Sequence, residues 1–192
     1  MLLSRANNST VDRPLIVGVG ASAGGLAAFK TFLTHMPANS GMAFVLVQHL
    51  DPDHTSLLVE LLRPNTAMPV VEAANQLTVQ SNHIYVIPPN ATLTLEGGSL
   101  RLIKPAPARQ FRRPIDTFFC SLAEDAGERA VAIVLSGVGS DGSLGVRAVK
   151  EHGGLALAQA EFDHEACSVC HRAQRQPGWS ITSSQSKRCR TS

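Results

Sequence analysis

The strongest constraint on the fold is an alternation of short apolar runs with amphipathic segments of helical period. The runs at residues 15–20 (LIVGVG), 42–48 (MAFVLVQ) and 130–135 (AVAIVL) are largely apolar and rich in β-branched residues. Strands of a parallel sheet that is covered on both faces have this composition. Residues 24–35 and 144–152 follow two of these runs and carry apolar side chains at helical spacing. The alternation predicts an α/β fold with a doubly wound, mostly parallel sheet.

The remaining segments extend this pattern and add one feature to it. Residues 92–95 and 100–103 alternate in polarity around Gly97 and Gly98, which predicts a β-hairpin in the middle of the chain. Pro114 is suited to the first turn of a helix. We expect further strands at residues 70–72, 83–87 and 155–158 and further helices at residues 56–62 and 115–126. The predicted fold is therefore a Rossmann-like sheet with an inserted hairpin.

Composition excludes several classes of protein. The 192 residues are 44% hydrophobic and 17% charged, which is enough to bury a core and excludes extensive disorder. The chain has no run of 18 apolar residues that would span a membrane, and its polar N-terminus lacks the apolar stretch of a signal peptide. We therefore expect a cytoplasmic protein that is not inserted in a membrane. The net charge of +2 is too small to indicate nucleic-acid binding.

Three residues with catalytic potential follow three of the predicted strands. Ser22 lies in GASAG, a G-x-S-x-G motif between a strand and a helix. His49 follows the second strand, and Asp141 lies in the glycine-rich loop after residues 130–135. A nucleophilic serine needs a histidine to remove its proton, and the histidine needs a carboxylate to orient it and to stabilise its charge. The pattern predicts a Ser-His-Asp triad.

Each of these residues has a common structural role when it is taken alone. Ser22 could cap the following helix, His49 could be a partly buried polar residue, and Asp141 suits a turn or a helix N-cap. Ligands bind at the carboxyl ends of the strands in sheets of this kind, so the three residues are expected to meet at one edge. This convergence favours the catalytic interpretation over the structural one.

The first loop also permits a second interpretation. Gly18, Gly20 and Ala23 fit G-x-G-x-x-G/A, the fingerprint of dinucleotide-binding folds. That fingerprint expects an acidic residue at the end of the second strand, where this chain has Gln48 and His49. A nucleotide-binding Rossmann-like module is therefore the alternative function.

Four segments of the chain resemble the catalytic domain of the chemotaxis protein-glutamate methylesterases, the CheB family. They read LIVGVGASAGGLAAF, VLVQHLDPDHTSLL, RRPIDTFF and IVLSGVGSDGSLGVRAVKEHGG, in the family's order and spacing, and they extend from about Pro14 to Gln159. The resemblance implies the fold of the family's C-terminal domain. It also implies a carboxylic ester hydrolase that converts glutamate γ-methyl esters on chemoreceptors into glutamate and methanol, and in many members deamidates receptor glutamines.

The resemblance also assigns roles to individual residues. Ser22 matches the family's nucleophile, His49 its base and Asp141 its acid, and the backbone N–H groups of Ala23 and Val138 would form the oxyanion hole. This chemistry needs no metal and no organic cofactor. The implied partners are methyl-accepting chemoreceptors or related signalling proteins. A receptor methyltransferase is a further implied partner, because RRPIDTFF and GVGSDGS resemble relatives that are fused to such an enzyme.

The resemblance divides the chain into three parts. Residues 1–13 are expected to be a flexible N-terminus without the family's receiver domain, and residues 14–160 a methylesterase domain whose C-terminal part is missing. Residues 161–192 hold three of the four cysteines and five basic against three acidic residues, which leaves residues 1–160 formally neutral. We interpret this atypical tail as disordered or out-of-frame sequence. A third possibility is then an inactive, truncated fragment of a methylesterase.

The tail also contains a motif that resembles a metal-binding or haem-attachment sequence. Cys167, Cys170 and His171 match C-x-x-C-H, the pattern of haem c attachment, and with His164 they resemble a zinc cluster. Haem attachment belongs to exported proteins, and a zinc site needs a fold around it, for which the tail has few apolar residues. We therefore expect no metal there.

Overall fold

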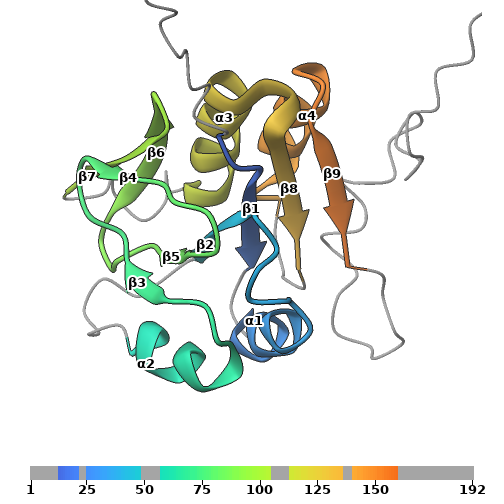
Figure 1. Cartoon of the computed structure of the whole chain (residues 1–192). Coiled ribbons are helices and arrows are strands. Elements are labelled where there is room, and N and C mark those ends of the chain that lie inside the picture. The colour runs from blue at the N-terminus through green and yellow to red at the C-terminus, as the bar shows by residue number, and fades with distance from the viewer. Residues whose placement is uncertain (1–12, 22–24, 49–56, 105–112, 136–139, 160–192) are drawn as a thin grey trace, which may run out of the picture.

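The computed structural model describes residues 13–21, 25–48, 57–104, 113–135 and 140–159. They form a sheet of six parallel strands with helices on both of its faces (Figure 1). In spatial order the strands are β3 (Val70–Glu72), β5 (Ile84–Val86), β2 (Ala43–Gln48), β1 (Ile16–Ala21), β8 (Ala130–Val134) and β9 (Leu155–Ala158). The predicted doubly wound α/β class is confirmed.

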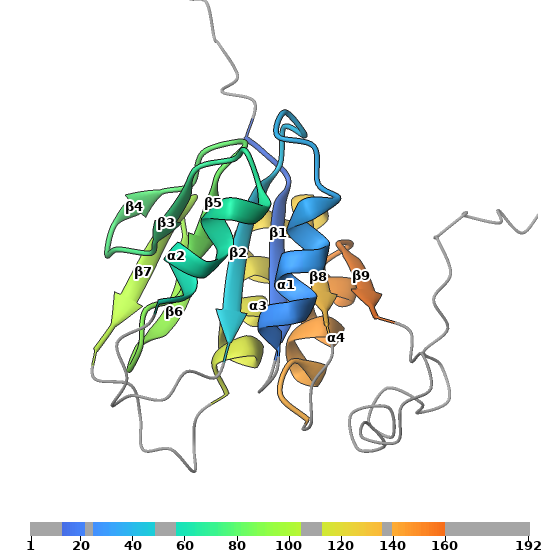
Figure 2. The ribbon, with the colours of Figure 1, turned by 90° about the horizontal axis from the view of Figure 1, so that it is seen from below.

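Within the described residues, four α-helices bury the two faces of this sheet. One face is covered by α1 (Gly25–Thr34) and α2 (Leu58–Leu62), and the other by α3 (Pro114–Ala126) and α4 (Ser143–Glu151), as Figure 2 shows. Short 3-10 turns follow α2 at Arg63–Asn65 and α3 at Gly127–Arg129. Two separate apolar cores result, and both sides of the central strands are buried. This explains why the sequence of these strands is apolar rather than alternating.

A smaller antiparallel sheet packs beside α3. It consists of β4 (Leu77–Thr78), β6 (Thr92–Glu96) and β7 (Ser99–Ile103) in the order β4-β7-β6. The turn between β6 and β7 has positive φ angles at Gly97 (59°) and Gly98 (76°), which glycine adopts without strain. Asp125 of α3 accepts the N–H groups of both glycines, at 2.9 Å for Gly98. The predicted hairpin is confirmed, and its turn is tied to the helix.

Strand β9 forms one edge of the large sheet and is partly exposed to solvent. Strand β9 pairs with β8, and its Leu155 and Leu157 are 50% and 38% exposed. Among the residues that the structure describes, no helix is long and apolar enough to cross a lipid bilayer.

Candidate functional site

The carboxyl ends of three neighbouring strands define the candidate site. Strands β1 and β2 are paired to their last residues, Ala21 and Gln48, which face each other in the parallel register. Val134 at the end of β8 pairs with Gly20, and the N–H of Leu135 donates to the Gly20 carbonyl at 2.9 Å. The ends of the three strands that precede the predicted triad residues in the sequence therefore lie side by side, as expected for neighbouring parallel strands.

The structure describes one member of the predicted triad. Ser22 and His49, which follow Ala21 and Gln48 in the sequence, lie outside the described residues, and so do Ala23 and Val138. Asp141 is described and is partly buried. The assignment of the nucleophile, the base and the oxyanion hole therefore stays a prediction, which the register of β1 and β2 supports.

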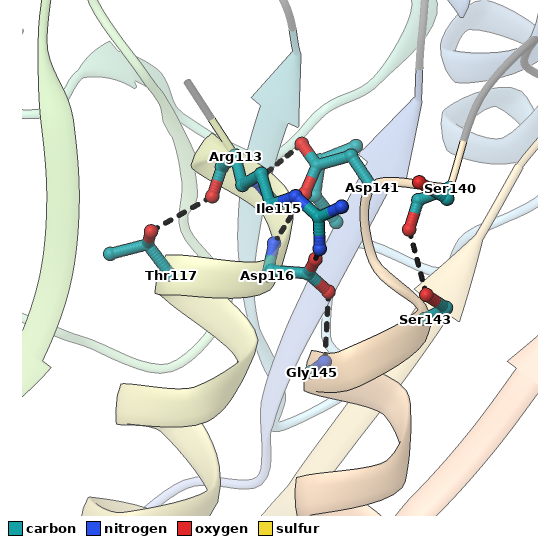
Figure 3. A network of polar contacts seen from close by, with 8 residues as sticks. All are labelled: Arg113, Ile115, Asp116, Thr117, Ser140, Asp141, Ser143 and Gly145. Carbon is teal, nitrogen blue, oxygen red and sulfur yellow. Dashed lines mark hydrogen bonds and ion pairs between the residues drawn. The ribbon is translucent and has the colours of Figure 1, made fainter. Parts of the chain in front are cut away.

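Asp141 lies between β8 and α4, and its carboxylate reaches the first turn of α3. Oδ2 accepts the N–H of Ile115 at 3.1 Å, and Oδ1 accepts the N–H of Asp116 at 2.9 Å (Figure 3). The first N–H groups of a helix have no acceptor within it, and the helix dipole favours an anion there. These contacts stabilise the negative charge of Asp141 and hold both of its oxygens.

A tight turn presents Asp141 to α3. The hydroxyl of Ser143 donates to the carbonyl of Ser140 at 2.7 Å, which closes the turn around Asp141 and Gly142. Gly142 has a φ of 98°, a conformation that other residues rarely adopt. The glycine after the aspartate in the SDG sequence is therefore required by the backbone of the turn.

A second aspartate, Asp116, completes the network. The residue is only 5% exposed, and its Oδ1 accepts the N–H of Gly145 in the first turn of α4 at 2.9 Å. Arg113 Nη1 lies 3.4 Å from its Oδ2. Burial raises the pKa of the Asp116 carboxyl and the charge of Asp141 adds to this rise, whereas the Gly145 N–H and Arg113 oppose it. Figure 3 shows the Asp141 carboxylate at the N-terminus of α3 and the Asp116 carboxylate at the N-terminus of α4.

Asp116 was not predicted to be a functional residue. It lies within RRPIDTFF, one of the four segments that resemble the family. A signal was present, because an aspartate among Ile115, Phe118 and Phe119 is an acidic residue on the apolar side of an amphipathic helix. Such a residue needs a buried hydrogen-bond donor, and here the donor comes from another helix.

The glycines of the predicted dinucleotide fingerprint have another role. Gly18 and Gly20 lie within β1, where they pair with Val45 and Val47, and not in the turn after it. A Cβ atom at Gly20 would lie 2.5 Å from Cγ2 of Ile115, and one at Gly18 would lie 2.8 Å from Cε1 of Phe119. The missing side chains make room for α3. This arrangement counts against the nucleotide-binding alternative, which requires the first glycine at the turn.

The described residues contain no group of three or more His, Cys, Asp and Glu side chains that could hold a metal ion. The C-x-x-C-H motif of Cys167, Cys170 and His171 lies outside the described residues.

Comparison with known proteins identifies a family. The model of the CheB methylesterase family matches residues 17–176. The catalytic domain of the Thermotoga maritima CheB methylesterase has a similar crystal structure, with a TM-score of 0.70 and 29% sequence identity, over 81% of this chain and 83% of that one.

Curated sequences agree with this result. A putative protein-glutamate methylesterase/protein-glutamine glutaminase of Leptospira interrogans is 32% identical over 142 residues, which are 73% of this chain and 74% of the relative. A protein-glutamate methylesterase/protein-glutamine glutaminase of Photorhabdus laumondii is 37% identical over 80% of this chain and 44% of its own length. An uncharacterised 104.1 kDa protein of Rhodobacter capsulatus is 46% identical over 55% of this chain. The chain spans only 11% of the Rhodobacter protein and 44% of the Photorhabdus protein, which is less than half the length of either relative.

Proposed function

The chain belongs to the CheB methylesterase family, and from this we propose that it hydrolyses γ-methyl esters of glutamate side chains on chemoreceptors or related signalling proteins. The observation that carries the proposal is that the carboxyl ends of β1, β2 and β8 lie side by side in the sheet. In the sequence a serine, a histidine and an aspartate follow these three strand ends. This supports a triad for nucleophilic ester hydrolysis, which requires the three side chains within hydrogen-bond reach of one another.

In the proposed reaction Ser22 Oγ attacks the ester carbonyl while His49 accepts its proton. The N–H groups of Ala23 and Val138 stabilise the oxyanion, a contribution of a few kcal/mol for each donor. Methanol leaves with the proton from His49, and a glutamyl ester of Ser22 remains. Water then attacks this ester, with His49 again as the base, and releases glutamate and the free serine. Receptor glutamines would react in the same way, with ammonia as the leaving group.

Asp141 would orient His49 and stabilise its positive charge during proton transfer. Its two oxygens are already held by the N–H groups of Ile115 and Asp116, so the carboxylate needs little reorganisation. Preorganised charge of this kind lowers the barrier because no dipole has to turn during the reaction.

The reaction would take place in the cytoplasm on a chemoreceptor, with a receptor methyltransferase as the enzyme that forms the esters. Neither a metal nor an organic cofactor takes part in these steps. The inactive-fragment alternative predicts a folded chain without activity.

Methanol release from methylated receptor membranes tests the proposal. The native chain should release methanol, and Ser22→Ala should abolish the release because the nucleophile is lost. Ser81→Ala is the matched control, since this serine precedes β5 at the amino-terminal side of the sheet and its loss should leave the rate unchanged. A native chain that is folded by circular dichroism and releases no methanol would support the inactive-fragment alternative instead.

A further inference from the structure

We propose that Asp116 is a positioning residue for Asp141: the two aspartates exchange helix caps between α3 and α4, and this exchange determines where the Asp141 carboxylate lies. The geometric part of the inference is independent of the reaction. The catalytic part rests on the proposed function, in which Asp141 is the acid of the triad.

The caps are reciprocal. Asp141, just before α4, accepts the N–H groups of Ile115 and Asp116 at the start of α3. Asp116, in the first turn of α3, accepts the N–H of Gly145 in the first turn of α4 at 2.9 Å. A displacement of either helix end would therefore break contacts of both aspartates.

The two helices are also in close backbone contact at this point. A Cβ atom at Gly145 would lie 2.3 Å from Cβ of Phe119 and 3.2 Å from the carbonyl oxygen of Asp116. The first turn of α4 thus rests directly on the first two turns of α3. Asp141 precedes Ser143, the first residue of α4, by two residues and is expected to move with this turn.

The burial of Asp116 and its hydrogen bond to another helix distinguish it from an ordinary helix-capping residue. A capping side chain at a helix start is commonly exposed and bonds to its own helix. The Asp116 carboxylate is instead buried and bonds to a neighbouring helix, and burial of a charge is costly unless hydrogen bonds compensate it. The Gly145 N–H and Arg113 supply part of that compensation. The energetic cost of burying this carboxylate has a functional reason if its contact with Gly145 keeps the Asp141 carboxylate in place.

Amide hydrogen exchange provides a readout that does not depend on activity. The Ile115 N–H has no acceptor within α3, so its protection reports the contact with Asp141. Asp116→Ala should accelerate exchange at Ile115 by about tenfold or more relative to Leu122 in the middle of α3. Asp116→Asn retains an acceptor for Gly145 and should restore most of the protection.

The matched control is Asp125→Ala. Asp125 lies on the same helix and also accepts backbone N–H groups, but it does so at the opposite end, from Gly97 and Gly98. Its loss should weaken the hairpin and leave both the exchange at Ile115 and the kinetics of the folded protein unchanged.

Kinetics of methanol release test the catalytic consequence. Asp116→Ala should lower kcat by about 10- to 100-fold and change KM little, since a small displacement of a catalytic group acts on the chemical step. Asp116→Asn should remain within about threefold of the native rate. If Asp116→Ala does not fold, Asp116→Glu replaces it: this change keeps the charge but moves the acceptor by one methylene, and it should also lower kcat.

The outcomes separate the two proposals. Loss of Ile115 protection together with a lower kcat, both rescued by Asp116→Asn, would support the inference. Exchange and kinetics equal to those of Asp125→Ala would overturn it. If the native chain releases no methanol, the proposed function fails, and exchange at Ile115 still decides whether Asp116 positions Asp141.

Discussion

The two ends of α3 use the same interaction in different environments. At its amino end, Asp141 accepts the N–H groups of Ile115 and Asp116 beside the carboxyl edge of the sheet. At its carboxyl end, Asp125 accepts the N–H groups of Gly97 and Gly98 in the hairpin turn. Both contacts join segments that are far apart in the sequence. Of these two contacts, only that of Asp141 lies where three strands end. Its position in the fold makes it part of the candidate site, whereas the contact of Asp125 joins α3 to the hairpin.

The largest expected effect comes from removal of the aspartate at the site end. Asp141→Ala should lower kcat/KM for ester hydrolysis by about 1,000-fold, because the base loses its orienting carboxylate. It should also reduce the free energy of unfolding by about 1 kcal/mol through loss of the helix cap. Methanol release and urea unfolding measure the two effects. Asp125→Ala should show a similar loss of stability without a change in kcat/KM of the folded protein, and equal kinetic losses in both variants would contradict the distinction.

A substitution in β1, beneath the amino end of α3, should have a smaller effect, and this effect concerns stability. Gly20→Ala would place a methyl group against Cγ2 of Ile115, and such overpacking costs about 1–3 kcal/mol. Urea unfolding measures this loss. Ile115→Ala removes the opposing atoms, so the double variant should be less destabilised than the sum of the two single changes. Strict additivity would show that Gly20 does not make room for Ile115.

The smallest expected effect concerns the pH dependence of stability. Burial raises the pKa of Asp116 in the folded protein above its usual value of 3.8, while Arg113 and Asp141 face the same carboxyl. The folded state therefore binds this proton more tightly than the unfolded chain. The resulting stabilisation is complete below the unfolded pKa and is lost as the pH rises through the folded pKa.

Asp116→Asn removes this titration. The free energy of unfolding of the variant, relative to that of the native chain, should therefore increase as the pH rises from about 4 to about 7. Urea unfolding of both proteins at constant ionic strength measures the difference. A relative stability that decreases over this range would show that the folded protein favours the ionised carboxylate.

Local sequence patterns were sufficient to predict the strands of the large sheet and the hairpin. Residues 130–135 correspond closely to β8, since apolar runs of this length that contain β-branched residues are typical of buried strands. Residues 155–158 correspond to β9, which is a short apolar run after Gly153 and Gly154. Strand β4 was not predicted. It consists of Leu77 and Thr78 alone, and its pairing with β7 determines its conformation. Such a short segment has no periodicity to detect.

The candidate site was predicted in part. Asp141 lies after β8 and contacts the first turn of α3, whereas its role as the acid of a triad stays a prediction. The roles of Ser22, His49, Ala23 and Val138 stay predictions as well. The division of the chain at residues 13 and 160 also stays a prediction, and the family model matches as far as residue 176. The interpretation of Gly18 and Gly20 as a nucleotide fingerprint was misleading, because the same glycine spacing serves close packing of α3 on β1.

The fold class was predictable from the sequence alone, and so were the carboxyl edge of the sheet as the expected place of the site and the candidate triad. These follow from the spacing of apolar residues and from motifs that are local in the chain. The hydrogen-bond partners of Asp116 and the packing of α3 against the β1 glycines became visible only in the folded structure. The N–H groups of Ile115, Asp116 and Gly145 that donate to Asp141 and Asp116 lie 25 to 29 residues away from them in the sequence. Hydrogen bonds over such separations form only when the packing of α3 and α4 on the sheet brings the two helix ends together.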